Sequence, residues 1–124
     1  MKTDRPVNLN LFKFRWPLAA MVSITHRVTG VILFAGVAFG LYALDMALSS
    51  AAGFDAATAL LAQPLPKLIM LGLLFVLTYH IVAGVKHLLL DFHIGDSLQG
   101  VFIGSIVVIV VSVIVTVILG GLLW

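Results

Sequence analysis

The sequence predicts an all-α membrane protein with three transmembrane helices and a short N-terminal arm at the membrane interface. Of its 124 residues, 62% are hydrophobic and only 10% are charged, whereas a soluble domain carries about a quarter charged residues. We treat residues 1–124 as a single transmembrane anchor domain. Because a bundle of three helices encloses little space, a cofactor pocket in it needs a partner subunit. The predicted spans cover roughly residues 17–48, 66–90 and 101–122, each long enough to cross about 30 Å of hydrocarbon.

The N-terminal arm, residues 1–20, is basic with apolar residues interleaved. Trp16 is expected at the membrane interface, and Pro17 suits the first turn of the helix that follows. The first apolar segment starts late and is long, which argues against a cleaved signal peptide. The bias in basic residues predicts a cytoplasmic N-terminus and no nucleic-acid patch. Five of the seven Lys and Arg residues stand in the first 27 positions: Lys2, Arg5, Lys13, Arg15 and Arg27.

The first span is expected to include Arg27, because its uncharged part, residues 28–44, is barely long enough to cross. Gly36 and Gly40 have the spacing that lets helices approach closely, although glycine that is merely tolerated in lipid is equally consistent. Residues 49–63 are predicted to form a loop with a short helical piece. Pro64 and Pro66 then mark the start of the second span.

The third span is rich in Val and Ile, which would suggest a strand in water. Its length and lack of charge favour a transmembrane helix that serves packing and sealing. Residues 91–100 are predicted to form the polar turn before it. With the N-terminus inside, three spans place the C-terminus outside. The basic arm, residues 23–27 and residues 87–96 then all approach the cytoplasmic face.

Polar residues on one face of the second span give the strongest indication of chemistry. His80, Gly84, His87 and Asp91 are spaced by four, seven and eleven residues, which places them on one side of a helix. An imidazole within the hydrocarbon layer is costly without a partner. His80 is therefore a candidate axial ligand of haem iron, with Gly84 letting a porphyrin approach and His87 meeting a propionate. A histidine bonded to a neighbouring helix is the simpler alternative.

Any haem bound here would be b-type, since the chain has no cysteine for covalent attachment or for iron–sulfur ligation. His80 and His87 lie about 10 Å apart along one helix and cannot bind opposite sides of one iron. His26 belongs to another span and lies nearer the interface, and His93 belongs to the turn. We therefore expect the second axial ligand to come from another chain, with a five-coordinate haem as the alternative.

A second polar group occurs near the start of the first span. Ser23 and Arg27 are four residues apart and share a helix face. A guanidinium at this depth must find an anion, water or a polar ligand. It either snorkels to lipid headgroups or, with Ser23, donates to the carbonyls of a quinone; His26 and Arg27 are also suited to haem propionates. Lys86 and Asp91 are predicted to form an exposed ion pair at the interface.

Together these residues resemble the cytochrome b556 membrane-anchor subunit of bacterial succinate dehydrogenase (complex II), over nearly the whole chain. The motifs that carry the resemblance are Arg5-Pro6 with Asn8-Leu9, Ser23-x-x-His26-Arg27-x-Thr29, and His80-x-x-x-Gly84-x-x-His87-x-x-x-Asp91.

The resemblance implies a subunit of an enzyme that passes electrons from succinate to ubiquinone, in the tricarboxylic acid cycle and the respiratory chain. The chain itself would be non-catalytic, because no residue set in it suits FAD or succinate. FAD and iron–sulfur clusters would reside in a flavoprotein and an iron–sulfur subunit. These two subunits, this chain and a second membrane anchor would form a heterotetramer in the bacterial inner membrane. Three such heterotetramers could associate into a trimer. The alternatives are the anchor of a quinol:fumarate reductase and a structural membrane adaptor without cofactor.

The resemblance also assigns roles to residues. His80 would be an axial ligand of a haem b shared with the second anchor, and Ser23 and Arg27 would contact the quinone. Lys86 stands where the family has arginine, so it would hold an anion as a point charge. The other implied site residues are Trp16 and Ile24 in the quinone pocket, and His26 and His87 near the haem propionates, beside Gly84.

Overall fold

The computed structural model describes residue 10 and residues 13–124. These residues form four α-helices, of which α1, α3 and α4 are long and apolar enough to cross a membrane. The predicted spans and the short helical piece are confirmed, with span ends that differ by three residues or fewer. The predictions for residues 1–9, 11 and 12, including the Arg5-Pro6 and Asn8-Leu9 motif, lie outside the described residues. The helices are α1 (Leu18–Ser49), α2 (Ala51–Leu61), α3 (Pro64–Asp91) and α4 (Leu98–Leu123).

Local chemistry explains why α3 and α4 begin earlier than predicted. Pro64 occupies the first turn of α3, where its missing N–H would have no helical partner. Ser97 caps α4, because its Oγ accepts a hydrogen bond of 3.0 Å from the backbone N–H of Gly100. The turn between the two helices passes through the left-handed region at His93 (φ 58°) and Gly95 (φ 74°).

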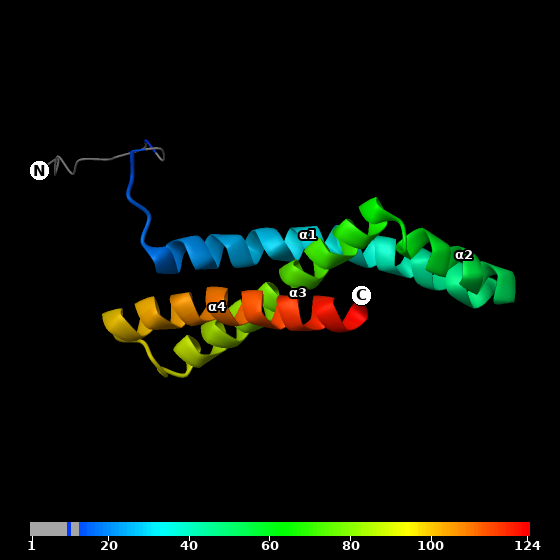
Figure 1. Cartoon of the computed structure of the whole chain (residues 1–124). Helices are drawn as coiled ribbons and strands as arrows, with labels where there is room; N and C mark the ends of the chain where they lie inside the picture. Colours follow the sequence, from blue (N-terminus) through cyan, green and yellow to red (C-terminus); the bar gives the residue numbers. More distant parts are fainter. Residues whose placement is uncertain (1–9, 11–12) are drawn as a thin grey trace, which may run out of the picture.

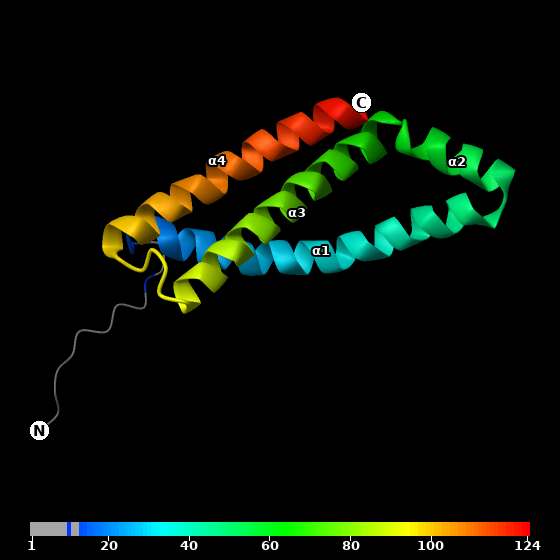
Figure 2. The ribbon, with the colours of Figure 1, turned by 90° about the horizontal axis from the view of Figure 1, so that it is seen from below.

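Helix α3 is the central element of the bundle and packs against both α1 and α4. Figures 1 and 2 show that the start of α1, the end of α3 and the start of α4 share one end of the molecule, which we call the site end. Helix α2 and the C-terminus lie at the opposite end. The predicted convergence of the start of the first span with the end of the second is confirmed, because the rings of His26 and His87 lie 5.2 Å apart.

The interface between α3 and α4 is built from small and hydroxyl-bearing residues. Ser105, Val108, Ser112 and Thr116 are all buried and fall on one stripe of α4. Small residues let membrane helices approach, and their hydroxyls bond across the contact. Thr116 does so, with its Oγ1 2.9 Å from that of Thr78 on α3. The packing role predicted for the third span therefore rests on this stripe.

Only one of the two glycines that were considered for close helix contact makes such a contact. A Cβ placed at Gly36 would lie 2.7 Å from Cδ2 of Leu73 on α3, whereas a Cβ at Gly40 would meet nothing within 4 Å. Gly36 therefore brings α1 and α3 together, and Gly40 is a glycine tolerated on an open surface.

Candidate functional site

His80, on α3, is held along one edge by residues of α1. Its Nδ1 atom lies 3.0 Å from the Thr29 hydroxyl oxygen and 3.1 Å from the backbone carbonyl oxygen of His26. The Thr29 hydroxyl in turn donates to that carbonyl at 2.7 Å. Gly30 leaves room for the ring, since a Cβ there would lie 3.2 Å from His80 Cε1. The ring is thus fixed through Nδ1, while Nε2 takes no part in these contacts.

The side chain of His26 covers one face of the His80 ring. The two imidazoles are stacked, with centroids 4.1 Å apart and planes at 15°. His26 stands eight residues from the start of α1 and His80 eleven from the end of α3, depths of about 12 and 16 Å at helical rise. We expected His26 to lie nearer the interface than His80. The two depths agree with that order, and their difference of about 4 Å still allows the rings to stack at 4.1 Å.

The stack does not suit a pair of axial ligands from this chain. An imidazole binds a metal through a ring nitrogen in the plane of its ring. Parallel rings 4.1 Å apart present their nitrogens side by side, not on opposite sides of an ion. Within the part of the chain that the structure describes, no group of three or more His, Cys, Asp or Glu residues is placed to hold a metal. In this arrangement His26 and His80 cannot lie on opposite sides of one ion.

Gly84 has a different neighbour from the one that the sequence suggested. A Cβ at Gly84 would lie 3.3 Å from Nε2 of His26, so the space above this glycine holds an imidazole. His87 is half-buried and its ring contacts His26 at 57°. Asp91, at the end of the same face, is exposed. The three histidines His26, His80 and His87 therefore form one cluster at the site end, which we call the histidine cluster.

The residues predicted to bind a quinone lie in the first third of α1 or just before it, and most of them are exposed. Ser23 is half-buried, and Arg27, Ile24 and Trp16 are exposed. Trp16 contacts Phe14 edge to face at 5.3 Å. None of the cavities described below is lined by these side chains.

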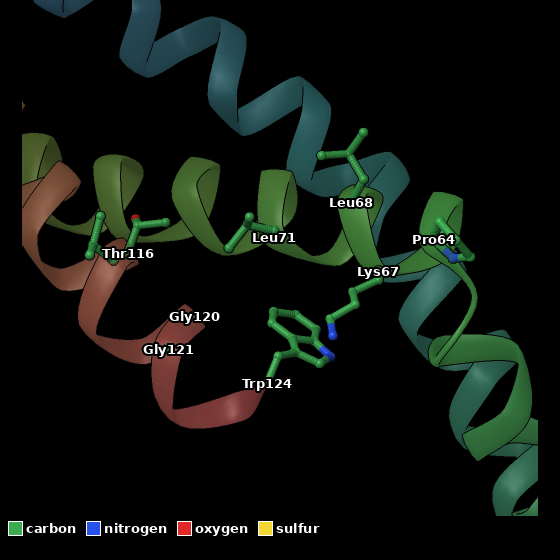
Figure 3. Close-up of a pocket in the computed structure, with 9 residues that line it drawn as sticks. Pro64, Lys67, Leu68, Leu71, Thr116, Gly120, Gly121 and Trp124 are labelled. Carbon is green, nitrogen blue, oxygen red and sulfur yellow. The ribbon is translucent and has the colours of Figure 1, made fainter.

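Cavities are found at the opposite end of the bundle. Figure 3 shows the one between α3 and α4, where the Lys67 side chain extends towards the Trp124 indole. The volume of this cavity is about 470 Å³, and Lys67 Nζ lies 5.4 Å from the centroid of the Trp124 ring. A cavity of about 290 Å³ lies between α1 and α3. Neither cavity is lined by a predicted site residue.

The predicted ion pair between Lys86 and Asp91 is wrong. Lys86 is only 8% exposed, and its ammonium donates to the hydroxyl of Ser105 on α4 at 2.9 Å. Five residues along a helix correspond to a rotation of about 140°, which turns Lys86 towards α4 and leaves Asp91 outside. Gly104 lies beside the lysine stem, since a Cβ there would be 3.4 Å from Lys86 Cε. Among the described residues, the carboxylate that does meet a basic side chain is Asp96, whose Oδ2 lies 3.2 Å from Nδ1 of His93.

Sequence reasoning did not give Thr29, Gly30 or Ser105 a role of their own. A hydroxyl in an apolar span commonly bonds to a neighbouring helix, and this rule could have singled out Thr29 and Ser105 from the sequence. To identify the bonding partner of Thr29, one must know how α1 crosses α3. The residue pattern of a single helix does not reveal that crossing.

The chain is similar to membrane subunits of respiratory complexes. Residues 1–119 match the sequence model of a family described as "Succinate dehydrogenase/Fumarate reductase transmembrane subunit". The chain is 36% identical to the succinate dehydrogenase cytochrome b556 subunit of Coxiella burnetii over the full length of both chains. It is 34% identical to the subunit of that name from Paracoccus denitrificans, over 90% of this chain and 92% of the relative. The mitochondrial succinate dehydrogenase cytochrome b560 subunit of Sus scrofa is 32% identical, over 90% of this chain and 67% of the relative.

Proposed function

Because this chain belongs to the succinate dehydrogenase/fumarate reductase transmembrane subunit family, we propose that it anchors a succinate dehydrogenase in the membrane and supplies His80 as one axial ligand of a haem b. It is a non-catalytic subunit of the enzyme complex, and succinate is oxidised in partner subunits. The relatives described above are named as succinate dehydrogenases, which favours succinate oxidation over fumarate reduction.

The observation that carries the haem proposal is the geometry of His80. Its Nδ1 is engaged by α1 at 3.0 and 3.1 Å, which leaves Nε2 as the ligand atom. Ligating histidines generally bond a carbonyl or carboxylate through the other ring nitrogen. When bound, a haem supplies a one-electron carrier. His80 would hold it, and His26, His87 and Arg27 would donate hydrogen bonds to its propionates.

The quinone proposal rests on the donors of α1. Ser23 and Arg27 stand one helical turn apart within the first ten residues of α1. A hydroxyl and a guanidinium at this spacing donate to a quinone carbonyl and stabilise the negative charge that develops on its oxygen during reduction. Ile24 and Trp16 add apolar surface for the ring. The remaining walls come from partner subunits.

The charge distribution supports a cytoplasmic site end in a bacterial inner membrane. Lys13 and Arg15 precede α1 and Arg27 is its tenth residue, and cytoplasmic flanks of membrane helices carry the excess of basic residues. At this face the chain would meet an FAD-containing flavoprotein and an iron–sulfur subunit. A second anchor subunit beside it would supply the other axial ligand and complete a heterotetramer.

Purification of the complex through an affinity tag on this chain tests the function. The expected eluate contains a flavoprotein, an iron–sulfur protein and a second small membrane protein, and it oxidises succinate with quinone as acceptor. A dithionite-reduced minus oxidised spectrum should show a b-type α-band, with one haem per tagged chain. An eluate that lacks the flavoprotein would contradict the anchor role, and an assembled complex without the band would contradict the haem proposal alone.

A further inference from the structure

Three polar atoms of α1 and α3 form a closed triangle at the edge of the histidine cluster. They are the Thr29 hydroxyl oxygen, the His26 carbonyl oxygen and His80 Nδ1, with separations of 2.7, 3.0 and 3.1 Å. All three distances are within hydrogen-bonding range. Each side of such a triangle needs a donated proton, either its own or one shared with a second side, so its protonation can be worked out by counting.

A carbonyl oxygen has no proton to donate, and a hydroxyl has one. The Thr29 proton lies on the 2.7 Å bond to the His26 carbonyl. The two contacts of His80 Nδ1 then face a hydroxyl lone pair and a carbonyl oxygen, both acceptors. They are satisfied only if Nδ1 carries a proton and shares it between them. An unprotonated Nδ1 would set its own lone pair against the carbonyl at 3.1 Å, which is repulsive.

We propose that Thr29 is a positioning residue: its hydroxyl, together with the His26 carbonyl, accepts from Nδ1–H of His80, and this pair of acceptors fixes the tautomer that presents the Nε2 lone pair to iron. This inference rests on the proposed function of His80. In a neutral imidazole, a proton on one nitrogen leaves the other as the acceptor. A hydrogen bond from Nδ1–H also makes the ligand more basic, which favours the oxidised, more positively charged iron.

The surroundings of Thr29 suit this role. Its side chain is only 5% exposed, so water does not compete for the hydroxyl. Threonine in a helix has few rotamers, and one of them bonds a carbonyl in the preceding turn, as it does here with His26 three residues earlier. Gly30 follows directly and admits the His80 ring. The rigid Thr29 hydroxyl bonds the edge of the His80 ring, and the missing side chain at Gly30 leaves room for that ring.

The test compares Thr29→Val, which replaces the hydroxyl with a methyl group of similar shape, with Thr29→Ser, which keeps the hydroxyl. The control is Thr58→Val, because Thr58 is exposed on α2 and bonds only its own helix at Phe54. Each variant complex is purified through the tag, and its haem content, haem dissociation and haem midpoint potential are measured.

Thr29→Val is expected to weaken haem retention by about 10- to 100-fold, the usual cost of losing such a supporting bond. The midpoint potential of the haem that remains should rise. Thr29→Ser and Thr58→Val should match the wild type. An assembled Thr29→Val complex with unchanged haem retention and potential would overturn the proposal. A wild-type complex without haem would instead overturn the proposed function.

A folding defect is separated by expressing the chain in haem-replete and haem-deficient cells. If the yield of Thr29→Val complex is below that of the wild type in haem-replete cells but equal to it in haem-deficient cells, the residue acts through the haem ligand. If it lowers the yield to the same extent in both, Thr29 is a packing residue and the inference is wrong.

Discussion

The imidazole rings of His26 and His80 stack face to face, with their centroids 4.1 Å apart and their planes at 15°. The contact joins α1 to α3 at the site end. It also assigns different tasks to the two histidines, because the backbone carbonyl of His26 accepts from His80 Nδ1 while its side chain covers the ring. The backbone part of this support does not depend on which side chain stands at position 26.

His26→Ala should therefore retain haem. The carbonyl and the Thr29 hydroxyl still hold His80 Nδ1, so the ligand remains oriented. We expect near-complete haem content and a shifted midpoint potential, because the stacked ring and a propionate donor are lost. Haem quantification and potentiometry of the purified complex check this. Haem loss as complete as that caused by replacing His80 would mean that His26 is itself a ligand.

Arg27→Ala and Ser23→Ala should impair quinone reduction while leaving succinate oxidation by an artificial dye intact. Losing a hydrogen bond to a charged donor costs about 1.5–3 kcal/mol, so kcat/KM for quinone should fall by about 10- to 100-fold in Arg27→Ala. The fall in Ser23→Ala should be smaller. Arg15→Ala is the matched control, since Arg15 is an exposed cation that precedes α1. Wild-type quinone kinetics in Arg27→Ala would show that this arginine only snorkels to lipid.

Gly36→Ala should leave the bundle less stable than Gly40→Ala does. The added methyl group at position 36 would lie 2.7 Å from Leu73, whereas position 40 is open. Both substitutions gain up to about 1 kcal/mol in helix propensity, and only at position 36 does overpacking subtract about 1–3 kcal/mol. Thermal melting of the detergent-solubilised complex, followed by the haem absorbance, measures both. Equal melting temperatures for the two variants would contradict the assigned contact between α1 and α3.

Ser105→Ala should cost more than Ser112→Ala, although both serines are fully buried. Ser105 accepts from the Lys86 ammonium, whereas Ser112 donates only to Val108 of its own helix. Leaving a buried donor unpaired costs about 1–3 kcal/mol or more.

A second substitution separates the cost of the unpaired Lys86 ammonium from any loss of packing at Ser105. Lys86→Met added to Ser105→Ala removes the unpaired ammonium, so much of the lost stability should return. The same thermal melts report it. If the double variant is less stable than Ser105→Ala alone, the lysine contributes through its stem and not through its bond to Ser105.

The spans could be predicted because hydrocarbon thickness and chain length leave few choices. The runs ending near Ser49, Asp91 and Leu123 are each long enough to cross. Pro64 in the first turn of α3 and the Ser97 cap of α4 shift the helix starts only slightly. The approach of residues 23–27 and 87–96 to one face followed from the number of spans and the bias in basic residues. These features depend on local sequence and on the number of spans, and both can be read from the sequence.

The contacts of the site could not be predicted in the same way. The bond between Thr29 and His80 joins residues 51 positions apart, and helical periodicity fixes a face but not the rotation of one helix against another. The same limit explains the error at Lys86, whose partner Ser105 lies on a different helix. The roles of Ser23, Ile24, Arg27 and Trp16 depend on walls that other polypeptides provide, so they stay predictions.

Haem quantification in purified His80→Ala complex tests the central claim most directly. His93→Ala is the matched control, because His93 lies exposed in the turn after α3 and pairs with Asp96. The account predicts one b-type haem per complex in the wild type and in His93→Ala, and none in His80→Ala, with the flavoprotein still co-purifying. A His80→Ala complex that keeps its full haem content and an unchanged α-band would contradict it.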